Sequence, residues 1–305
     1  MSQKVAYLFA GQGAQYVGMG KDLYVAFLES KAVFDKAEEV LGFDLKRRCF
    51  EGPPDLLKST VISQPAILTV SIAAYEAFKV RTDIKPAFLA GLSLGEYTAL
   101  IVAGSLAFED GLRLVRRRAE MMDDASRKYP GKMAAVLDLP FDKVKDICFK
   151  SHAEISNINA PGQTVISGKP EAVDKARELC IEAGAKRVID LEVSGGFHSS
   201  LMFEASVDLK MFLHNTPMFP PSIPVVSNYT AMPQYKVPQI QENLVYQMRS
   251  PVRWEDSMRF ILSQGITQFF EIGPGRVLKG LMRRIDETAQ VTNIEKKEDI
   301  LNLSK

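Results

Sequence analysis

Short apolar runs and helix-spaced apolar residues alternate along the first part of the chain. Residues 5–10 are continuously apolar and are followed by Gly11-Gln12-Gly13, which predicts a buried strand and a glycine turn. Residues 87–90 predict a second buried strand. Helical patterns cover residues 22–41, 62–80, 94–102 and 110–122, and Pro65 is placed at the start of the second. Strands that alternate with helices indicate an α/β fold with a mostly parallel sheet.

The pattern changes after the Tyr129-Pro130-Gly131 turn. Strands are predicted at 133–137, 154–159, 164–167 and 186–193, with helices at 141–150 and 171–183. This β-α-β-β-α-β order is the ferredoxin-like one. We therefore predict an inserted subdomain at 129–193 within a core made of 1–128 and 194–305. Strands at 223–227 and 268–272 and a helix at 277–285 return to that core.

Composition and charge exclude several classes of protein. The 305 residues are 46 % hydrophobic and 25 % charged, as in ordinary globular proteins. Thirty-eight basic and 37 acidic residues give a net charge of +1, which argues against a nucleic-acid partner. Three cysteines without C-x-x-C spacing favour reduced thiols over disulfides or zinc. With no apolar run of about 18 residues, we expect a soluble, cytoplasmic protein without a membrane span or metal.

The sharpest chemical signal is Gly91-Leu92-Ser93-Leu94-Gly95, between a predicted strand and a predicted helix. In such a G-x-S-x-G turn the serine sits on a strained elbow, and the flanking glycines relieve crowding. Its hydroxyl is then exposed beside a helix N-terminus that can stabilise an oxyanion. The plain alternative is a serine in a tight turn.

A nucleophilic serine needs a base, and the chain has three histidines. His198 lies in a loop of small residues after the inserted subdomain, where a cleft between subdomains is expected. It is equally compatible with a histidine that caps the following helix. His152 and His214 have polar surroundings and are interpreted as surface residues.

Two further segments can contribute to a site. The turn at 11–13 is either simple punctuation or a source of a backbone N–H for an oxyanion hole. Arg116, Arg117 and Arg118 are adjacent in a predicted helix, so at least one should face the protein. An inward arginine needs an anion or a carboxylate partner.

Taken in order, the motifs resemble those of the malonyl-CoA:acyl-carrier-protein transacylase family of fatty acid and polyketide synthesis. The resemblance covers nearly the whole chain, at residues 11–15, 63–66, 91–97, 115–122, 157–163, 196–199, 250–254 and 271–275. It implies an α/β-hydrolase-like core with a mostly parallel sheet and an inserted ferredoxin-like subdomain. It also implies an acyltransferase that moves a malonyl group to the phosphopantetheine thiol of an acyl carrier protein through a malonyl-serine intermediate.

The resemblance also implies residue roles, which follow its motifs position by position. They are nucleophile Ser93, general base His198, oxyanion-hole N–H groups of Gln12 and Leu94, carboxylate-binding Arg118, cleft residues Gln64 and Asn159, acyl-selecting Phe197, and the main-chain carbonyl of Gln247, which orients the histidine. One departure concerns the residue before the nucleophile, commonly histidine in the family and Leu92 here. Phe197 should crowd a branched acyl chain and disfavour methylmalonyl.

Malonyl-CoA and a holo acyl carrier protein are the implied substrates, with no cofactor, no metal and a monomeric enzyme. Carrier proteins are acidic, so exposed basic residues are candidate contacts: Lys279, Arg283, Arg284, Arg116 and Arg117. Two alternatives stay open. An acyl hydrolase acting on carrier-protein thioesters would keep Ser93 and His198 but would have little use for Arg118. A non-catalytic component of a larger synthase would need neither Ser93 nor His198 nor the oxyanion turn at 11–13.

Overall fold

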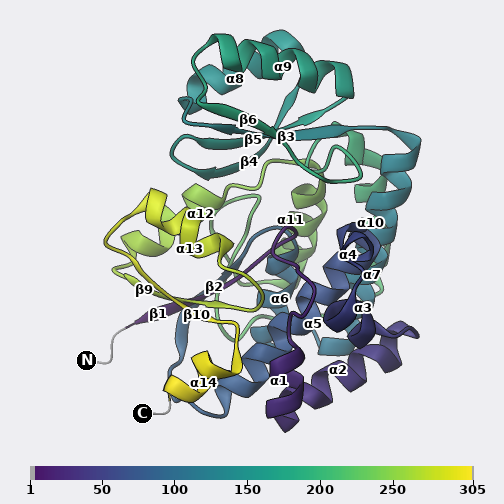
Figure 1. Ribbon diagram of the computed structural model, residues 1–305, viewed down its shortest axis with the longest axis vertical. Coiled ribbons are helices and arrows are strands. Elements are labelled where there is room, and N and C mark those ends of the chain that lie inside the picture. The colour runs from purple at the N-terminus through teal and green to yellow at the C-terminus, as the bar shows by residue number, and fades with distance from the viewer. Residues whose placement is uncertain (1–3, 304–305) are drawn as a thin grey trace.

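A six-stranded sheet lies inside the larger part of the molecule in the computed structural model, which describes residues 4–303 (Figure 1). Its strand order is β10-β9-β1-β2-β7-β8, and every neighbouring pair is parallel except β7–β8. This confirms the predicted mostly parallel sheet. The bounds are β1 Val5–Phe9, β2 Pro86–Gly91, β7 Val225–Val226, β8 Pro233–Gln234, β9 Gln268–Ile272 and β10 Gln290–Ile294.

Helices cover both faces of this sheet, and the side chains of β1 alternate between them. Val5, Tyr7 and Phe9 belong to the larger apolar core. Ala6 and Leu8 belong to a second core on the opposite face. Because both faces are buried, β1 reads as a continuous apolar run rather than an alternating one. The larger core includes residues of α1 Lys21–Ala26, α2 Leu28–Leu41, α3 Leu45–Glu51, α4 Pro54–Lys58, α5 Thr60–Lys79, α6 Leu94–Val102, α7 Phe108–Lys128, α10 Phe203–His214, α11 Val237–Arg249 and α14 Lys297–Leu303; the second includes residues of α12 Trp254–Ser263 and α13 Val277–Ile285.

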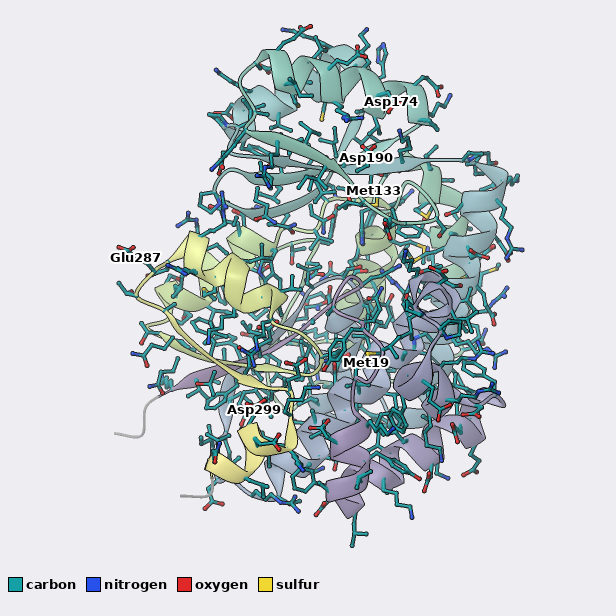
Figure 2. All side chains as sticks on the ribbon, viewed as in Figure 1. Met19, Met133, Asp174, Asp190, Glu287 and Asp299 are labelled. Atoms are coloured by element: carbon teal, nitrogen blue, oxygen red, sulfur yellow. The ribbon has the colours of Figure 1, made fainter. Side chains whose placement is uncertain are left out.

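A smaller antiparallel sheet lies above α12 and α13 in Figure 1. Its order is β4-β5-β3-β6, with β3 Lys132–Leu137, β4 Glu154–Ala160, β5 Gln163–Gly168 and β6 Arg187–Asp190. Helices α8 Phe141–Ser151 and α9 Pro170–Glu182 pack on one face, against Ala134 and Val136. The intervening residues Met133 and Ala135 face the large part of the molecule instead, where Figure 2 shows Met133. The predicted β-α-β-β-α-β order is confirmed.

Backbone hydrogen bonds fasten the small sheet to the large part. The Ile158 N–H donates to the Val252 carbonyl at 2.9 Å, and the Val252 N–H donates to the Ser156 carbonyl at 2.8 Å. The Arg284 guanidinium, at the end of α13, also pairs with Asp138 after β3. These contacts fix one side of the space between the two sheets.

The prediction that Pro65 begins a helix was wrong. Helix α5 starts at Thr60, and Pro65 lies inside it. Hydrogen bonds from the Ile62 and Ser63 N–H groups to the Ser59 carbonyl extend the helix before the proline. The proline removes one hydrogen bond of the helix, in its second turn, and the helix continues to Lys79.

Other differences lie at element ends and in the last third of the chain. The predicted helix at 22–41 is interrupted at Phe27, whose backbone is extended. The strands predicted at 186–193 and 223–227 are shorter, Arg187–Asp190 and Val225–Val226. The elements that were not predicted are helices α3, α4, α10, α11, α12 and α14 and strands β8 and β10.

Helix α5 is long and apolar enough to cross a membrane by length and composition alone. Yet 83 % of its most apolar 18-residue window is buried inside the protein. Core helices of globular proteins pass the same test because they are apolar on all sides. Here α5 packs against α2, α6 and α7.

Candidate active site

Ser93 occupies a sharp elbow between β2 and α6. Its backbone has φ 52° and ψ −101°, an unusual conformation for a residue with a side chain. A Cβ on Gly91 would lie 1.9 Å from the carbonyl carbon of Gly95, and a Cβ on Gly95 would lie 2.1 Å from the Phe9 oxygen. Only glycine fits at either position, so both glycines of the G-x-S-x-G sequence are explained by the close packing of the turn.

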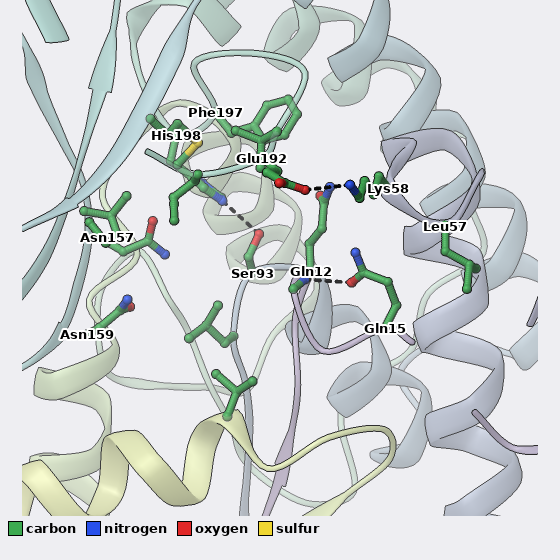
Figure 3. Close-up of a pocket in the computed structure, with 18 of the residues that line it drawn as sticks. Gln12, Gln15, Leu57, Lys58, Ser93, Asn157, Asn159, Glu192, Phe197 and His198 are labelled. Atoms are coloured by element: carbon green, nitrogen blue, oxygen red, sulfur yellow. Dashed lines mark hydrogen bonds and ion pairs between the residues drawn. The ribbon is translucent and has the colours of Figure 1, made fainter. Parts of the chain in front are cut away.

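Ser93 and His198 form a hydrogen-bonded pair, although 105 positions separate them in sequence. The serine Oγ is 2.8 Å from the histidine Nε2, and the histidine Nδ1 is 2.6 Å from the main-chain oxygen of Gln247. A carbonyl can only accept, so Nδ1 carries the proton and Nε2 is free to accept from the serine. Figure 3 shows the pair at the wall of the cleft. This is the geometry that a general base and a nucleophile need.

His198 does not cap the helix that follows it. That role belongs to the Ser199 side chain, which accepts from the Leu201 N–H at the start of a short 3₁₀ turn. His198 itself is buried. His152 and His214 are exposed, as expected.

The electrostatic surroundings keep His198 neutral. Burial lowers its pKa to about 4, and the positive charge of Arg118 acts in the same direction, while the hydrogen bond to Gln247 opposes it. The imidazole is therefore in its basic form at neutral pH.

Arg118 is the inward member of the arginine triplet. Its side chain is only 1 % exposed, whereas Arg116 and Arg117 are exposed enough to pair with Glu120 on the same helix. Adjacent residues of a helix point about 100° apart, so Arg118 can face the interior while Arg116 and Arg117 face the solvent.

The Arg118 guanidinium is held by neutral groups. Nη1 donates to the Gln64 side chain at 2.6 Å, and Nη2 donates to Ser93 Oγ and to the Gln247 side chain, both at 3.1 Å. The guanidinium also lies 5.2 Å from the centre of the Tyr97 ring. Within residues 4–303 no carboxylate forms an ion pair with it. A buried cation with only neutral hydrogen-bond acceptors has capacity to bind an anion beside Ser93.

Sequence reasoning missed a buried carboxylate close to the pair. Glu96, on the first turn of α6, is fully buried and accepts hydrogen bonds from the Asn228 N–H and from the amides of Gln234 and Gln247. Burial raises its pKa to about 7, against the effect of these hydrogen bonds. The Ser-x-x-Glu spacing was the available signal, because a glutamate there belongs to the first helical turn.

The glycine turn after β1 packs directly against the elbow. The Leu92 N–H donates to the Phe9 carbonyl at 3.0 Å, and a Cβ on Gly11 would lie 2.3 Å from the Leu92 oxygen. Gln12 therefore lies at the same sheet edge as Leu94, the first residue of α6. Their role as an oxyanion hole stays a prediction.

A cleft of about 710 Å³ opens between the two sheets, with Ser93 and His198 in its wall. Asn159, Phe197 and Leu92 also line it. Gln64 was predicted to line the cleft, but its side chain is fully buried behind the wall and contacts Arg118 instead. At the edge of the cleft, Figure 3 shows Lys58 of α4 paired with Glu192, which follows β6, at 2.8 Å.

Residues 4–303 contain no group of three or more histidine, cysteine, aspartate or glutamate side chains placed to hold a metal ion. The expectation that the reaction needs no metal or cofactor stays a prediction. The cleft presents a serine hydroxyl that is hydrogen-bonded to a neutral histidine, and the buried guanidinium of Arg118 lies behind its wall, in contact with Ser93 Oγ.

Fold and site together are those of an acyl-transfer class of protein, and the comparisons place the chain in the same class. Residues 6–300 match the family described as "Acyl transferase domain", so the chain belongs to that family. It is 43 % identical to the malonyl CoA-acyl carrier protein transacylase of Bacillus subtilis, over 97 % of this chain and 95 % of that one. It is 40 % identical to the protein of the same name from Staphylococcus aureus, over 97 % of each.

Solved structures show the same likeness. A malonyl-transacylase in complex with its type II PKS acyl-carrier protein superposes with a TM-score of 0.96 at 36 % identity, over 98 % of each chain. An acyl carrier protein S-malonyltransferase from Vibrio cholerae gives a TM-score of 0.95 at 36 % identity, over 99 % of this chain and all of that one. These structures share the mixed α/β architecture described above.

Proposed function

We propose that this enzyme transfers a malonyl group from malonyl-CoA to the phosphopantetheine thiol of an acyl carrier protein, in fatty acid or polyketide synthesis. The observation that carries the proposal is the placement of Arg118. Its Nη2 lies 3.1 Å from Ser93 Oγ, with no carboxylate partner within residues 4–303. An acyl group that ends in a carboxylate supplies the missing anion where the ester forms.

In the first half-reaction Ser93 Oγ attacks the thioester carbonyl while its proton moves to His198 Nε2. The resulting oxyanion is stabilised by the N–H groups of Gln12 and Leu94, each worth about 3 kcal/mol in comparable sites. The carbon–sulfur bond then breaks. The CoA sulfur takes the proton from His198 and leaves a malonyl-serine ester.

The second half-reaction reverses these steps with a different thiol. The phosphopantetheine thiol of the carrier gives its proton to His198 and its sulfur attacks the ester carbonyl. The bond to Ser93 breaks, and Oγ recovers the proton. The Gln247 carbonyl, 2.6 Å from Nδ1, stabilises the transient imidazolium in both halves.

Selectivity follows from the two sides of the acyl pocket. The malonyl carboxylate takes over Arg118 hydrogen bonds that now go to Ser93 and the Gln247 side chain. Phe197, buried and in the cleft wall, limits the space for a branch on the acyl chain. We expect methylmalonyl to react about tenfold to a few hundredfold more slowly on steric grounds.

The carrier is proposed to dock on exposed basic residues near the cleft. Arg284 is paired with Asp138, and Arg116 and Arg117 are paired with Glu120. Lys279 and Arg283 are exposed on α13 and have no ion pair within the part of the chain that the structure describes. An acidic carrier surface therefore has these two cations available first.

The fold supports a finer description, which we include in the proposal. The elbow serine follows a central parallel strand, which is typical of an α/β-hydrolase-like core, here 1–128 and 194–305. Residues 129–193 are proposed as the inserted ferredoxin-like subdomain. Three free, buried cysteines suit a reducing compartment, and we propose that the enzyme acts in the cytoplasm as a monomer.

Intact-protein mass spectrometry tests the function directly. Mixing with malonyl-CoA should give a malonyl adduct on Ser93, weaker adducts should form with acetyl-CoA and methylmalonyl-CoA, and holo carrier protein should remove the malonyl group. Rapid CoA release without an adduct or a carrier would favour the acyl hydrolase. Neither adduct nor release would leave the non-catalytic synthase component.

A further inference from the structure

Three hydrogen-bond donors converge on the buried carboxylate of Glu96. Oε2 accepts from the Asn228 N–H at 3.1 Å and from Gln247 Nε2 at 2.9 Å, while Oε1 accepts from Gln234 Nε2 at 2.8 Å. A glutamate three residues after an N-cap serine ordinarily reaches back to that serine's N–H. Here the Ser93 N–H is bonded to Asn228 instead, so the carboxylate is turned toward the interior.

Resting on the acyl-transfer function proposed above, we propose that Glu96 is a positioning residue, whose carboxylate orients the Ser93–His198 pair without touching it. Two arms connect the carboxylate to the pair, one through Gln247 and one through Asn228. Each arm ends on an atom that the reaction needs.

The Gln247 arm places the base. Its Nε2 is held by Glu96 and by the Ser93 carbonyl, both at 2.9 Å. The amide is thereby fixed with Oε1 toward Arg118 Nη2, and the main chain of the same residue accepts from His198 Nδ1. A displacement of Gln247 therefore moves both the carbonyl that orients His198 and the side-chain oxygen that accepts from Arg118.

The Asn228 arm places the nucleophile. Its Oδ1 accepts from the Ser93 N–H at 2.6 Å, and its Nδ2 donates to the Gly91 carbonyl at 2.8 Å. Asn228 therefore holds both sides of the strained elbow. Its own N–H is held by Glu96, which ties the elbow to the same carboxylate as the base.

Glu96 also supplies a counter-charge for Arg118 without occupying it. The two groups interact through the Gln247 amide rather than as a direct ion pair. A direct pair would fill the place that an incoming carboxylate takes. The titratable or charged groups nearest to this network are Arg118 of α7, Tyr97 of α6 and His198.

This role has a pH signature. Because burial raises the pKa of Glu96 to about 7, the carboxylate gains its charge as pH rises through neutrality. The rate of Ser93 acylation should therefore rise between pH 6 and 8. With the pKa of His198 lowered to about 4, protonation of the base does not account for a rise in that range.

The test is the rate at which a fluorophosphonate ester labels Ser93, followed from pH 5 to 8.5 together with acylation by malonyl-CoA. Glu96→Gln removes the charge and sets an NH₂ group against the converging donors. We expect both rates to fall about 10- to 100-fold, as small displacements of reacting groups do. We also expect the rise near pH 7 to disappear.

Glu271→Gln is the matched control. Glu271 is also buried and accepts three hydrogen bonds, from the Leu278 and Lys279 N–H groups and from the Asn293 amide, but it holds α13 and not the pair. It should lower the melting temperature and leave the labelling rate and its pH profile unchanged. Were Glu96→Gln to lose only stability in the same way, Glu96 would be a structural residue and the inference would be wrong.

If Glu96→Gln does not fold, Glu96→Asp replaces it. Aspartate keeps the charge but retracts it by one methylene, so we expect a slower rate with the rise near pH 7 retained; a wild-type rate contradicts the inference. Labelling by the fluorophosphonate separates this inference from the proposed function, because it needs Ser93 and His198 but no malonyl group. If the wild-type protein is labelled but does not transfer malonyl, only the proposed function is contradicted.

Discussion

At the scale of single residues, the site depends on how a buried cation is satisfied. Arg118 is surrounded by Gln64, Ser93 and Gln247, all neutral. Burial lowers the pKa of its guanidinium, while Tyr97 and Glu96 oppose that shift. We therefore expect an incoming malonyl carboxylate to gain a charge-assisted hydrogen bond that a neutral acyl group does not.

Replacing this cation should change acyl selectivity. Arg118→Ala is expected to slow malonyl adduct formation about 10- to 100-fold, the cost of a lost hydrogen bond to a charged group. The acetyl adduct should form at least as fast as in the wild type. Arg117→Ala, on the exposed face of the same helix, is the control for acylation by malonyl-CoA. Unaltered malonyl acylation in Arg118→Ala would contradict the role given to this arginine.

His198 should make the fold sensitive to acid. Its pKa is about 4 in the folded protein and near 6.5 in an unfolded chain, so between these values only the unfolded chain takes up the proton. The free energy of unfolding therefore decreases as the pH is lowered from 6.5 to 4, by about 3 kcal/mol for this group. His198→Ala lacks this titration, so its free energy of unfolding should fall less than that of the wild type between pH 7.5 and pH 4.

Urea unfolding at a series of pH values from 4 to 7.5 measures this difference. His214→Ala, which removes an exposed histidine, is the control. A constant difference between His198→Ala and the wild type over the whole range would show that His198 is not kept neutral by its surroundings.

At the scale of elements, the elbow works because a strand, a turn and a helix approach more closely than side chains permit. Gly91 faces the backbone of Gly95, and Gly95 faces the backbone of β1. Backbone atoms at the centre of a sheet cannot move aside. The parallel pairing of β1 with β2 thus brings the glycine turn and the elbow together.

Glycines in this protein should therefore differ sharply in their tolerance of alanine. Gly95→Ala is expected to destabilise the fold by about 3 kcal/mol or more, because the added methyl meets a carbonyl oxygen. Gly280→Ala, in α13 with nothing within 4 Å of the new methyl, should stabilise it by about 0.5–1 kcal/mol. Chemical denaturation measures both. Equal effects would contradict the packing described for the elbow.

At the scale of the whole molecule, the cleft lies between the two sheets, and segments far apart in the sequence line it. Lys58 comes from α4 and Glu192 from the segment after β6. Among the described residues that line the cleft, they carry its one permanent positive charge and its one carboxylate. Since CoA and phosphopantetheine both carry phosphate, we expect Glu192 to compete with the substrate for Lys58.

The two partners of this ion pair should have opposite effects on substrate affinity. Glu192→Gln frees Lys58 and is expected to lower the KM for malonyl-CoA about two- to fivefold, whereas Lys58→Gln should raise it by a similar factor. The value of kcat should not change. Added salt should remove both effects, since exposed charges are screened within about 10 Å. If both variants shift KM in the same direction, the ion pair holds the two sides of the cleft together and Lys58 does not bind the substrate.

Much of the architecture and of the site could be read from local pattern. Strand β9 and helix α13 match their predicted ranges, and the elbow serine falls between a strand and a helix as predicted. These elements are recognisable because burial on one or both faces leaves a period in the sequence. Among the elements that were missed, α11 and α12 are amphipathic and carry a helical period that the sequence reading passed over, whereas β8 has two residues and is too short to leave a period.

The sequence by itself determined the elements around the nucleophile, the order of strands and helices in the small sheet, and a set of candidate residues with the right chemistry. Only the tertiary structure decided which of them meet. It separated Arg118 from its two neighbours, placed Gln64 behind the cleft wall, and assigned Ser199 rather than His198 to the helix end. It also turned Glu96 inward. Hydrogen bonds between residues far apart in the chain, such as Arg118–Gln64 and Gln247–Glu96, leave no period in the sequence, so packing alone reveals them.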